Sequence, residues 1–256
     1  ESDKENKRAF NREASLQLIS DTWGTISMGR VGSIVSDMGT YGFYAGAVNP
    51  FGTGWSGLGG QGIGGGNVFA TNDTRYDNTL TYKSPTFAGT TIYAQYSFRE
   101  NDLIKDVGDE NTHRANRYAA LGANFTTGNL TLATVVDWVD EACGDDAGAI
   151  VNEPEDKYTF NIGGNYDFGV MKVYAAAQYF KNANSFGGMN GDWFADAEVT
   201  DKGPLATMAG FDELKGYAVA LGANVPAFGG NFLVSLAYSD GEDDAKDATA
   251  EFTAYQ

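Results

Sequence analysis

The chain has 256 residues, of which 34 are acidic and 17 are Lys or Arg, so its formal net charge is -17. This acidic excess argues against nucleic acid or an anionic membrane surface as a partner. The mean hydropathy is -0.32, and no stretch approaches the roughly 18 consecutive apolar residues of a membrane-spanning helix. A strand of a membrane barrel needs only about 9 to 11 residues with apolar side chains at alternate positions, so low hydropathy does not exclude a barrel.

Alternating apolar and polar residues recur along the chain, and this pattern predicts strands with two different faces. The clearest case is 157–168, where Tyr158, Phe160 and Ile162 alternate with polar residues such as Thr159. The segments 90–99, 171–179, 217–225 and 232–238 repeat it. All such segments together predict eleven strands, which start near residues 9, 22, 74, 89, 115, 129, 157, 170, 216, 231 and 248.

The connections between these strands alternate in length along the chain. Short ones are expected at 21–22, 84–89, 127–128, 167–169 and 227–230. Long ones are expected at 31–73, 100–114, 140–156 and 181–215, followed by an intermediate, acidic one at 239–247. This alternation indicates an up-and-down meander between two environments, with tight turns on one side and long loops on the other. Aromatic residues near both ends of the strands are typical of the two membrane interfaces.

Three segments give the chain a specific resemblance. One is Phe10–Leu18 followed by Trp23–Arg30, the second is Asn49-Pro50-Phe51-Gly52 inside a long Gly-rich connection, and the third is Arg75–Pro85 with Phe87-Ala88-Gly89 and Tyr96-Ser97. In these segments the chain resembles the general diffusion porins of Gram-negative outer membranes.

The resemblance implies an all-β fold, a transmembrane antiparallel up-and-down β-barrel of sixteen strands. The chain would supply about eleven of them, the fourth to the fourteenth, as one barrel domain over 1–256 that lacks the first three and last two. Residues 31–73 would be the loop that folds into the lumen. The implied function is a water-filled channel for passive diffusion of small hydrophilic solutes and ions, without a cofactor. The implied setting is a homotrimer integral to the outer membrane, in contact with its lipids and lipopolysaccharide.

The resemblance also places Arg12 and Arg75 in a basic cluster on the pore wall, with Arg30 at the top of the next strand, facing the inward loop. An Arg suits this role because its charge does not titrate away. Strict alternation puts Arg75 on one face with Asp77, Thr79, Thr81 and Lys83, as a lumen residue requires. Arg12 instead shares a face with apolar residues, so either a bulge intervenes or the outer face there contacts a subunit.

The expected inward loop differs from the family in its charge. Residues 31–70 hold thirteen Gly and a single charged residue, Asp37, whereas the family's loop usually carries several acids opposite the arginines. Asp37 is therefore the candidate acid of the constriction, and Asn49, Pro50, Phe51 and Gly52 mark the loop. We therefore hypothesise that the transverse electric field is weaker and that the pore discriminates among solutes more by its diameter.

Other interpretations of the sequence lead to different functions. Barrel enzymes of outer membranes use a His base, and the single His113, beside Thr112 and Arg114, supplies neither a catalytic triad nor a metal site, so no enzyme is expected. The single Cys143 excludes an intrachain disulfide. The alternative function is a soluble or surface-displayed β-sandwich adhesin that binds glycans, which would stay monodisperse without detergent. Acidic residues gather in two presumed outer loops. One interpretation is that they are ordinary solvated charges. The other is that they enrich cations at the mouth of the pore, with divalent ions bridging to lipopolysaccharide.

Overall fold

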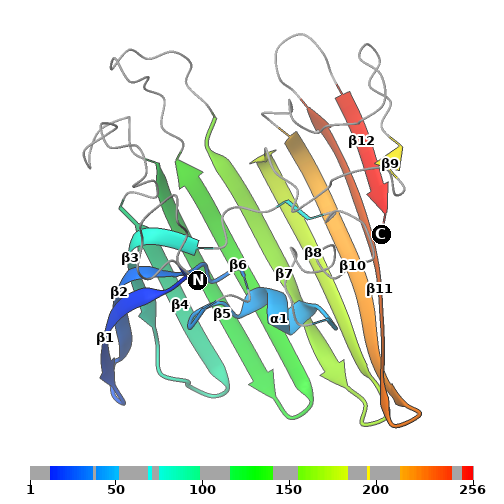
Figure 1. The fold of residues 1–256 in the computed structure, drawn as a ribbon, viewed down its shortest axis with the longest axis horizontal. Helices are drawn as coiled ribbons and strands as arrows, with labels where there is room; N and C mark the ends of the chain where they lie inside the picture. The colour runs from blue at the N-terminus through cyan, green and yellow to red at the C-terminus, as the bar shows by residue number, and fades with distance from the viewer. Residues whose placement is uncertain are drawn as a thin grey trace.

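The computed structural model describes residues 12–36, 39–51, 69–70, 75–98, 116–140, 155–183, 195–196, 214–243 and 250–255. Within them the chain forms one twelve-stranded antiparallel sheet and one short helix (Figure 1). The elements are β1 (Ala14–Ser20), β2 (Gly24–Gly32), α1 (Tyr44–Val48), β3 (Arg75–Lys83), β4 (Thr90–Ser97), β5 (Arg117–Thr127), β6 (Leu130–Asp140), β7 (Lys157–Asp167), β8 (Lys172–Ala183), β9 (Ala195–Asp196), β10 (Leu214–Ala227), β11 (Gly230–Asp243) and β12 (Ala250–Tyr255).

The predicted meander is confirmed, because successive long strands pair antiparallel along the sheet and the short turns gather at one rim (Figure 1). Two elements were not predicted. β9 has two residues and pairs with β12 at the far edge, so β8 pairs directly with β10. α1 has five residues. Elements this short leave no period in a sequence. The described residues contain no helix that is long and apolar enough to cross a membrane.

The two faces of the sheet differ in polarity. Leu121, Val136, Phe160 and Tyr179 lie opposite one another on neighbouring strands and form a continuous outer row, and each is exposed by 44 to 60%. Further large apolar side chains exposed on the outer face are Leu80, Ile92, Leu132, Ile162, Val219, Leu221, Val234 and Leu236. An apolar surface of this extent is unfavourable in water and suits the hydrocarbon of a bilayer.

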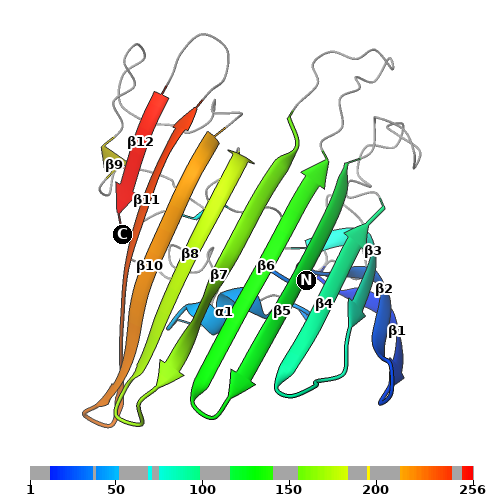
Figure 2. The same ribbon diagram turned by 180° about the vertical axis from the view of Figure 1, so that it is seen from behind.

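The inner, concave face carries the buried polar residues and the apolar core together. The buried polar side chains are those of Ser27, Thr79, Thr81, Thr91, Gln95, Ser97, Asp137, Thr159, Asn161, Asn165, Gln178, Asn182 and Ser239. The core is formed where the segment after β2 packs on this face, and it includes Ile34, Tyr44 and Val48 against Val135 and Ala176. Figure 2, seen from behind, shows α1 on the far side of the sheet, inside its curve.

Candidate functional site

The segment that follows β2 is fixed to the inner wall as soon as it leaves the strand. The side-chain amide of Gln95 on β4 accepts a hydrogen bond from Ile34 N (3.3 Å) and donates to Gly32 O (3.0 Å). The same nitrogen lies 3.0 Å from Thr81 Oγ1 on β3. Gln95 therefore binds the backbone of the segment as a neighbouring strand would, on both sides of one residue.

Helix α1 lies across β6, β7 and β8 (Figure 1). Just before it, the Phe43 ring stacks on Tyr93 of β4 with ring centroids 4.3 Å apart. Within it, Ala47 O accepts a hydrogen bond of 2.6 Å from Asn165 Nδ2 on β7. The start of this stretch is held by the Glu13 carboxylate, which accepts from Thr40 N (3.1 Å) and from Thr40 Oγ1 (2.5 Å).

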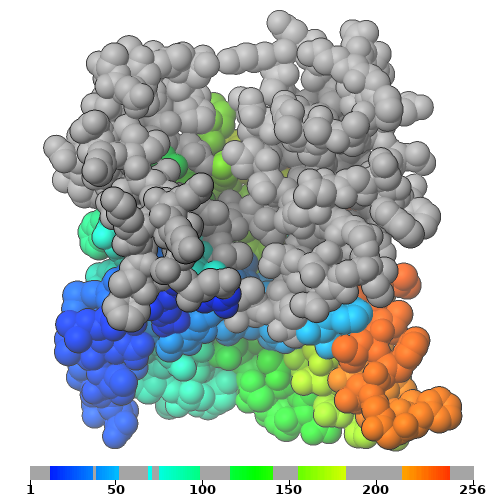
Figure 3. Space-filling model, viewed as in Figure 1, coloured from blue at the N-terminus to red at the C-terminus, as the bar shows by residue number. Residues whose placement is uncertain are grey.

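Glycines on the inner wall provide the space that this segment occupies. A methyl group added to Gly222 of β10 would lie 2.8 Å from two ring carbons of Pro50. A methyl at Gly163 of β7 would lie 2.8 Å from Val48, and one at Gly122 of β5 would lie 3.0 Å from Phe43. Figure 3 shows the light-blue atoms of this segment crossing the concave face toward the orange strands. Small residues thus set how closely the segment approaches the wall.

The chain returns along the same wall before β3 begins. Ala70 N donates to Gln178 Oε1 (2.8 Å), and Gln178 Nε2 donates to Ala70 O (2.9 Å). Gln178 lies on β8, two residues beyond Ala176, which pairs with Gly163. The described parts of 31–70 therefore form two legs against the inner wall. The backbone of the outgoing leg is bound by Gln95, and that of the returning leg is bound by Gln178.

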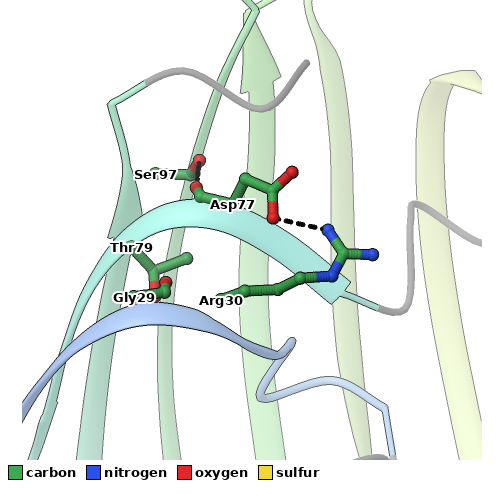
Figure 4. Close-up of polar contacts among 5 residues, drawn as sticks. All are labelled: Gly29, Arg30, Asp77, Thr79 and Ser97. Atoms are coloured by element: carbon green, nitrogen blue, oxygen red, sulfur yellow. Dashed lines mark hydrogen bonds and ion pairs between the residues drawn. The ribbon is translucent and has the colours of Figure 1, made fainter. Parts of the chain in front are cut away.

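A charged pair lies at the end of β2 and the start of β3. Arg30 Nη1 is 2.6 Å from Asp77 Oδ1, with side chains 23% and 14% exposed. Figure 4 shows the two side chains extending toward each other from adjacent strands. Ser97 Oγ donates to Asp77 O (2.6 Å) and Thr79 Oγ1 donates to Gly29 O (2.7 Å), so the backbone around the pair is also braced.

Residues 1–256 match the family model described as Gram-negative porin. The chain belongs to the Gram-negative porin family. It is therefore an integral protein of the outer membrane, and its antiparallel meander with an apolar outer face is the wall of a β-barrel.

Several known proteins are similar to this porin. An outer membrane porin protein of Bordetella pertussis strain Tohama I is 29% identical to it over 209 residues. The match covers 74% of this chain and 51% of the relative, so the chain spans about half of that relative's length. Among solved structures, an anion-selective porin from Comamonas acidovorans aligns with 95% of this chain and 76% of its own, at 17% identity and a TM-score of 0.42. A porin refined at 1.8 Å aligns with 94% and 79%, at 12% identity and a TM-score of 0.45.

Strict alternation does not continue through the start of β3. The register between β2 and β3 shifts between Gly29 and Val31, and Asn78 adopts a left-handed conformation with φ 51°. Tyr76, opposite Val31, is therefore the residue that continues the inner face of Thr79. Tyr76 is buried and stacks on Tyr118 with ring centroids 3.7 Å apart. Arg75 is half-buried, opposite Gly32 at the first position of β3.

Arg12 is exposed and lies in a bend just before β1. The register of β1 with β2 is continuous from Ala14 to Ser20, so Leu16 and Leu18 face outward and no bulge intervenes within the strand. Because β1, β2 and β3 are antiparallel neighbours, Arg12, Arg30 and Arg75 all belong to the same end of the sheet.

The predicted loop residues are only partly described. Asn49 is buried and its Oδ1 accepts from Phe51 N (2.9 Å), which makes a tight turn around Pro50. The Phe51 side chain is 41% exposed. Asp37 and Gly52 lie outside the described residues, as do His113 and Cys143. The sequence reasoning missed Glu13, Gln95, Asn165, Gln178 and the wall glycines, although glutamine and glycine at inner positions of strands are visible in the sequence.

Tyr41 and Tyr44, in the described part of the segment, both have raised pKa values. Burial raises the pKa of Tyr44 far above its ordinary value. Burial also raises the pKa of Tyr41, with the negative charge of Glu13 adding to the effect and a hydrogen bond to Ser27 opposing it. Both hydroxyls therefore stay neutral at physiological pH, and neither contributes charge to the lumen.

Proposed function

We propose that this porin forms a water-filled channel through which small hydrophilic solutes and ions diffuse passively, with no chemical step. The observation that supports the proposal best is the reversal of polarity across the sheet. The outer row Leu121, Val136, Phe160 and Tyr179 is apolar, whereas the inner face of the same strands carries Asp137, Thr159, Asn161 and Gln178. A wall of this kind separates hydrocarbon from water.

Residues 31–73 are proposed to narrow this channel, with Asn49, Pro50, Phe51 and Gly52 in the part that crosses the lumen. The contacts of Gln95, Asn165 and Gln178 with the segment support this, because they hold it flat on the inner wall. Arg12, Arg30, Arg75 and Asp37 are proposed to provide the charges of the constriction. Arg30 is already paired with Asp77, which favours a weak transverse field, so solute size would matter more than charge.

The proposed setting is a homotrimer of sixteen-stranded barrels that contacts outer-membrane lipids and lipopolysaccharide. Leu16, Leu18 and Met28 form an exposed apolar patch on β1 and β2, which is the surface that we propose for contact with a neighbouring subunit. At the proposed mouth, the acidic loops would enrich cations.

Single-channel recording in planar bilayers, with the full-length porin, tests the proposed function. We expect discrete conductance steps that scale with bulk salt, and liposome swelling rates that fall smoothly as neutral sugars become larger. Absence of conductance, or transport that saturates with one solute, would contradict it. A protein that stays monodisperse without detergent would favour the adhesin instead.

A further inference from the structure

Four hydrogen bonds connect the returning leg of the loop to a buried carboxylate on the wall. Ala70 N donates to Gln178 Oε1 (2.8 Å), and Gln178 Nε2 donates to Asn161 Oδ1 (2.8 Å). Asn161 Nδ2 then donates to Thr159 Oγ1 (2.7 Å), and the Thr159 hydroxyl donates to Asp137. The series crosses β8, β7 and β6, and every donor in it points the same way.

Asp137 sets that direction because an ionised carboxylate only accepts hydrogen bonds. The Thr159 hydroxyl must therefore donate to it and accept from Asn161, which fixes the orientation of the Asn161 amide. Asn161 then presents its oxygen to Gln178, so the Gln178 oxygen is directed at Ala70 N and its nitrogen is shared between Asn161 and Ala70 O (2.9 Å). Asp137, Asn161 and Gln178 are each at most 3% exposed, so water competes little for these groups.

We propose that Gln178, oriented by Asn161, Thr159 and Asp137, is a positioning residue that holds the returning leg of the loop against the wall and thereby keeps the constriction open and steady. The inference rests on the proposed channel function. Gln95 binds the outgoing leg, and Gln178 is its counterpart for the returning leg. If the two hydrogen bonds to Ala70 are lost, the population of channels with a detached leg rises roughly 5- to 30-fold.

A leg released from the wall moves into the lumen, because the wall behind it is already filled by close-packed side chains. The expected signature is therefore excess noise in the open-channel current and a lower mean conductance. This differs from the effect of removing the loop, which raises conductance. Excess noise with lower conductance therefore indicates a displaced loop, whereas higher conductance indicates a missing one.

The first test compares Gln178→Leu with Gln17→Leu in the full-length porin. Gln17 lies at an inner position of β1, opposite Ser27, and its Nε2 donates to Ser15 Oγ (3.5 Å), so the same substitution is made away from the returning leg of the loop. We expect excess noise in Gln178→Leu only. Circular dichroism and thermal unfolding of both variants establish that each has folded.

The second test uses Gln178→Glu across a pH series. The Gln amide donates two hydrogen bonds here, to Ala70 O and Asn161 Oδ1. A protonated carboxyl group can still accept from Ala70 N and donate to one of these two oxygens, whereas an ionised one only accepts and would face both. The noise of Gln178→Glu should thus be lowest at acidic pH and should rise as the introduced carboxyl group ionises. Asp137 and Tyr118 are the other ionisable side chains in this part of the wall, so the wild type is recorded over the same pH series.

The outcomes distinguish the two proposals. If the wild type conducts and Gln178→Leu is as quiet as Gln17→Leu, Gln178 does not position the loop, although the channel function stands. If the noise of Gln178→Glu does not depend on pH, loss of shape rather than of hydrogen bonding explains it, and positioning by the hydrogen bonds of Gln178 is refuted. If no form of the porin conducts, the channel function itself fails.

Discussion

The inner and outer faces of the same strands follow different packing rules. On the outer face, large apolar side chains such as Leu121 and Phe160 stand exposed. On the inner face, Gly122, Gly163 and Gly222 leave room for single side chains of the loop, and amides bind its backbone. The outer face therefore needs only to be apolar, whereas the inner face needs a particular size and donor at each position.

A charged side chain introduced on the outer face should have the largest effect on stability. Leu121→Arg lies in the middle of β5 on the outer face, and we expect it to destabilise the barrel by about 2 to 4 kcal/mol because an Arg near the bilayer midplane loses its hydration. Phe87→Arg, in the exposed turn before β4, is the matched control, with an expected cost of about 0 to 1 kcal/mol. Denaturant unfolding of vesicle-inserted porin measures both. Equal costs would mean that the outer face does not contact hydrocarbon.

A methyl group added to the inner face should have the second largest effect on stability. Gly222→Ala places its Cβ 2.8 Å from Pro50, and overpacking of this kind costs about 1 to 3 kcal/mol or displaces the loop. Ala223→Val adds two methyl groups to the opposite face of β10, where we expect a change within about 0.5 kcal/mol. Unfolding free energies and single-channel conductance report on both variants. A conductance and stability unchanged by Gly222→Ala would refute close packing of Pro50 on the wall.

The Arg30–Asp77 pair should affect selectivity more than stability. Asp77→Asn removes a negative charge beside Arg30 and should shift reversal potentials toward anions, whereas Arg30→Gln removes a positive charge and should shift them toward cations. The double variant should return close to the wild type. The expected change in stability is about 1 kcal/mol or less. Shifts of the same sign in both single variants would show that the pair does not face the ion path.

The smallest effect is expected from the acidic outer loops. The twelve acids of 140–156 and 239–247 lie in these loops and at the adjoining ends of β6 and β11. They should favour cations at low salt, since the Debye length is about 30 Å at 0.01 M, and this preference should weaken near 1 M, where it is about 3 Å. Reversal potentials across a salt series measure it. A preference for anions at low salt, or one that does not depend on salt, would contradict the account of charge at the mouth.

The strands could be predicted from the sequence because each face keeps its polarity over many residues. Tyr158, Phe160 and Ile162 alternate with polar partners along β7, and the short turns separate such runs regularly. α1 could not be predicted, because five residues held by contacts with the wall carry no period of their own. Its position depends on residues more than a hundred places away, such as Asn165.

The residues that bind the loop to the wall were not predicted, for identifiable reasons. Alternation was assumed to continue from Thr79 to Arg75 through Asn78, yet a short polar side chain that tolerates a left-handed conformation is where such a register shift is expected. The wall glycines were not singled out, although glycine within a strand often marks a close approach of another part of the chain. Gln95 and Gln178 carried a signal as well, since both are amides at inner positions of otherwise regular strands.

Deletion of residues 45–66 from the full-length porin tests the central claim, that an inward loop narrows a water-filled channel, most directly. Single-channel conductance and the size limit for neutral sugars are measured beside the wild type. We predict a higher conductance and entry of larger sugars, because the loop no longer occupies the lumen. A folded deletion variant with unchanged conductance and size limit would contradict the claim.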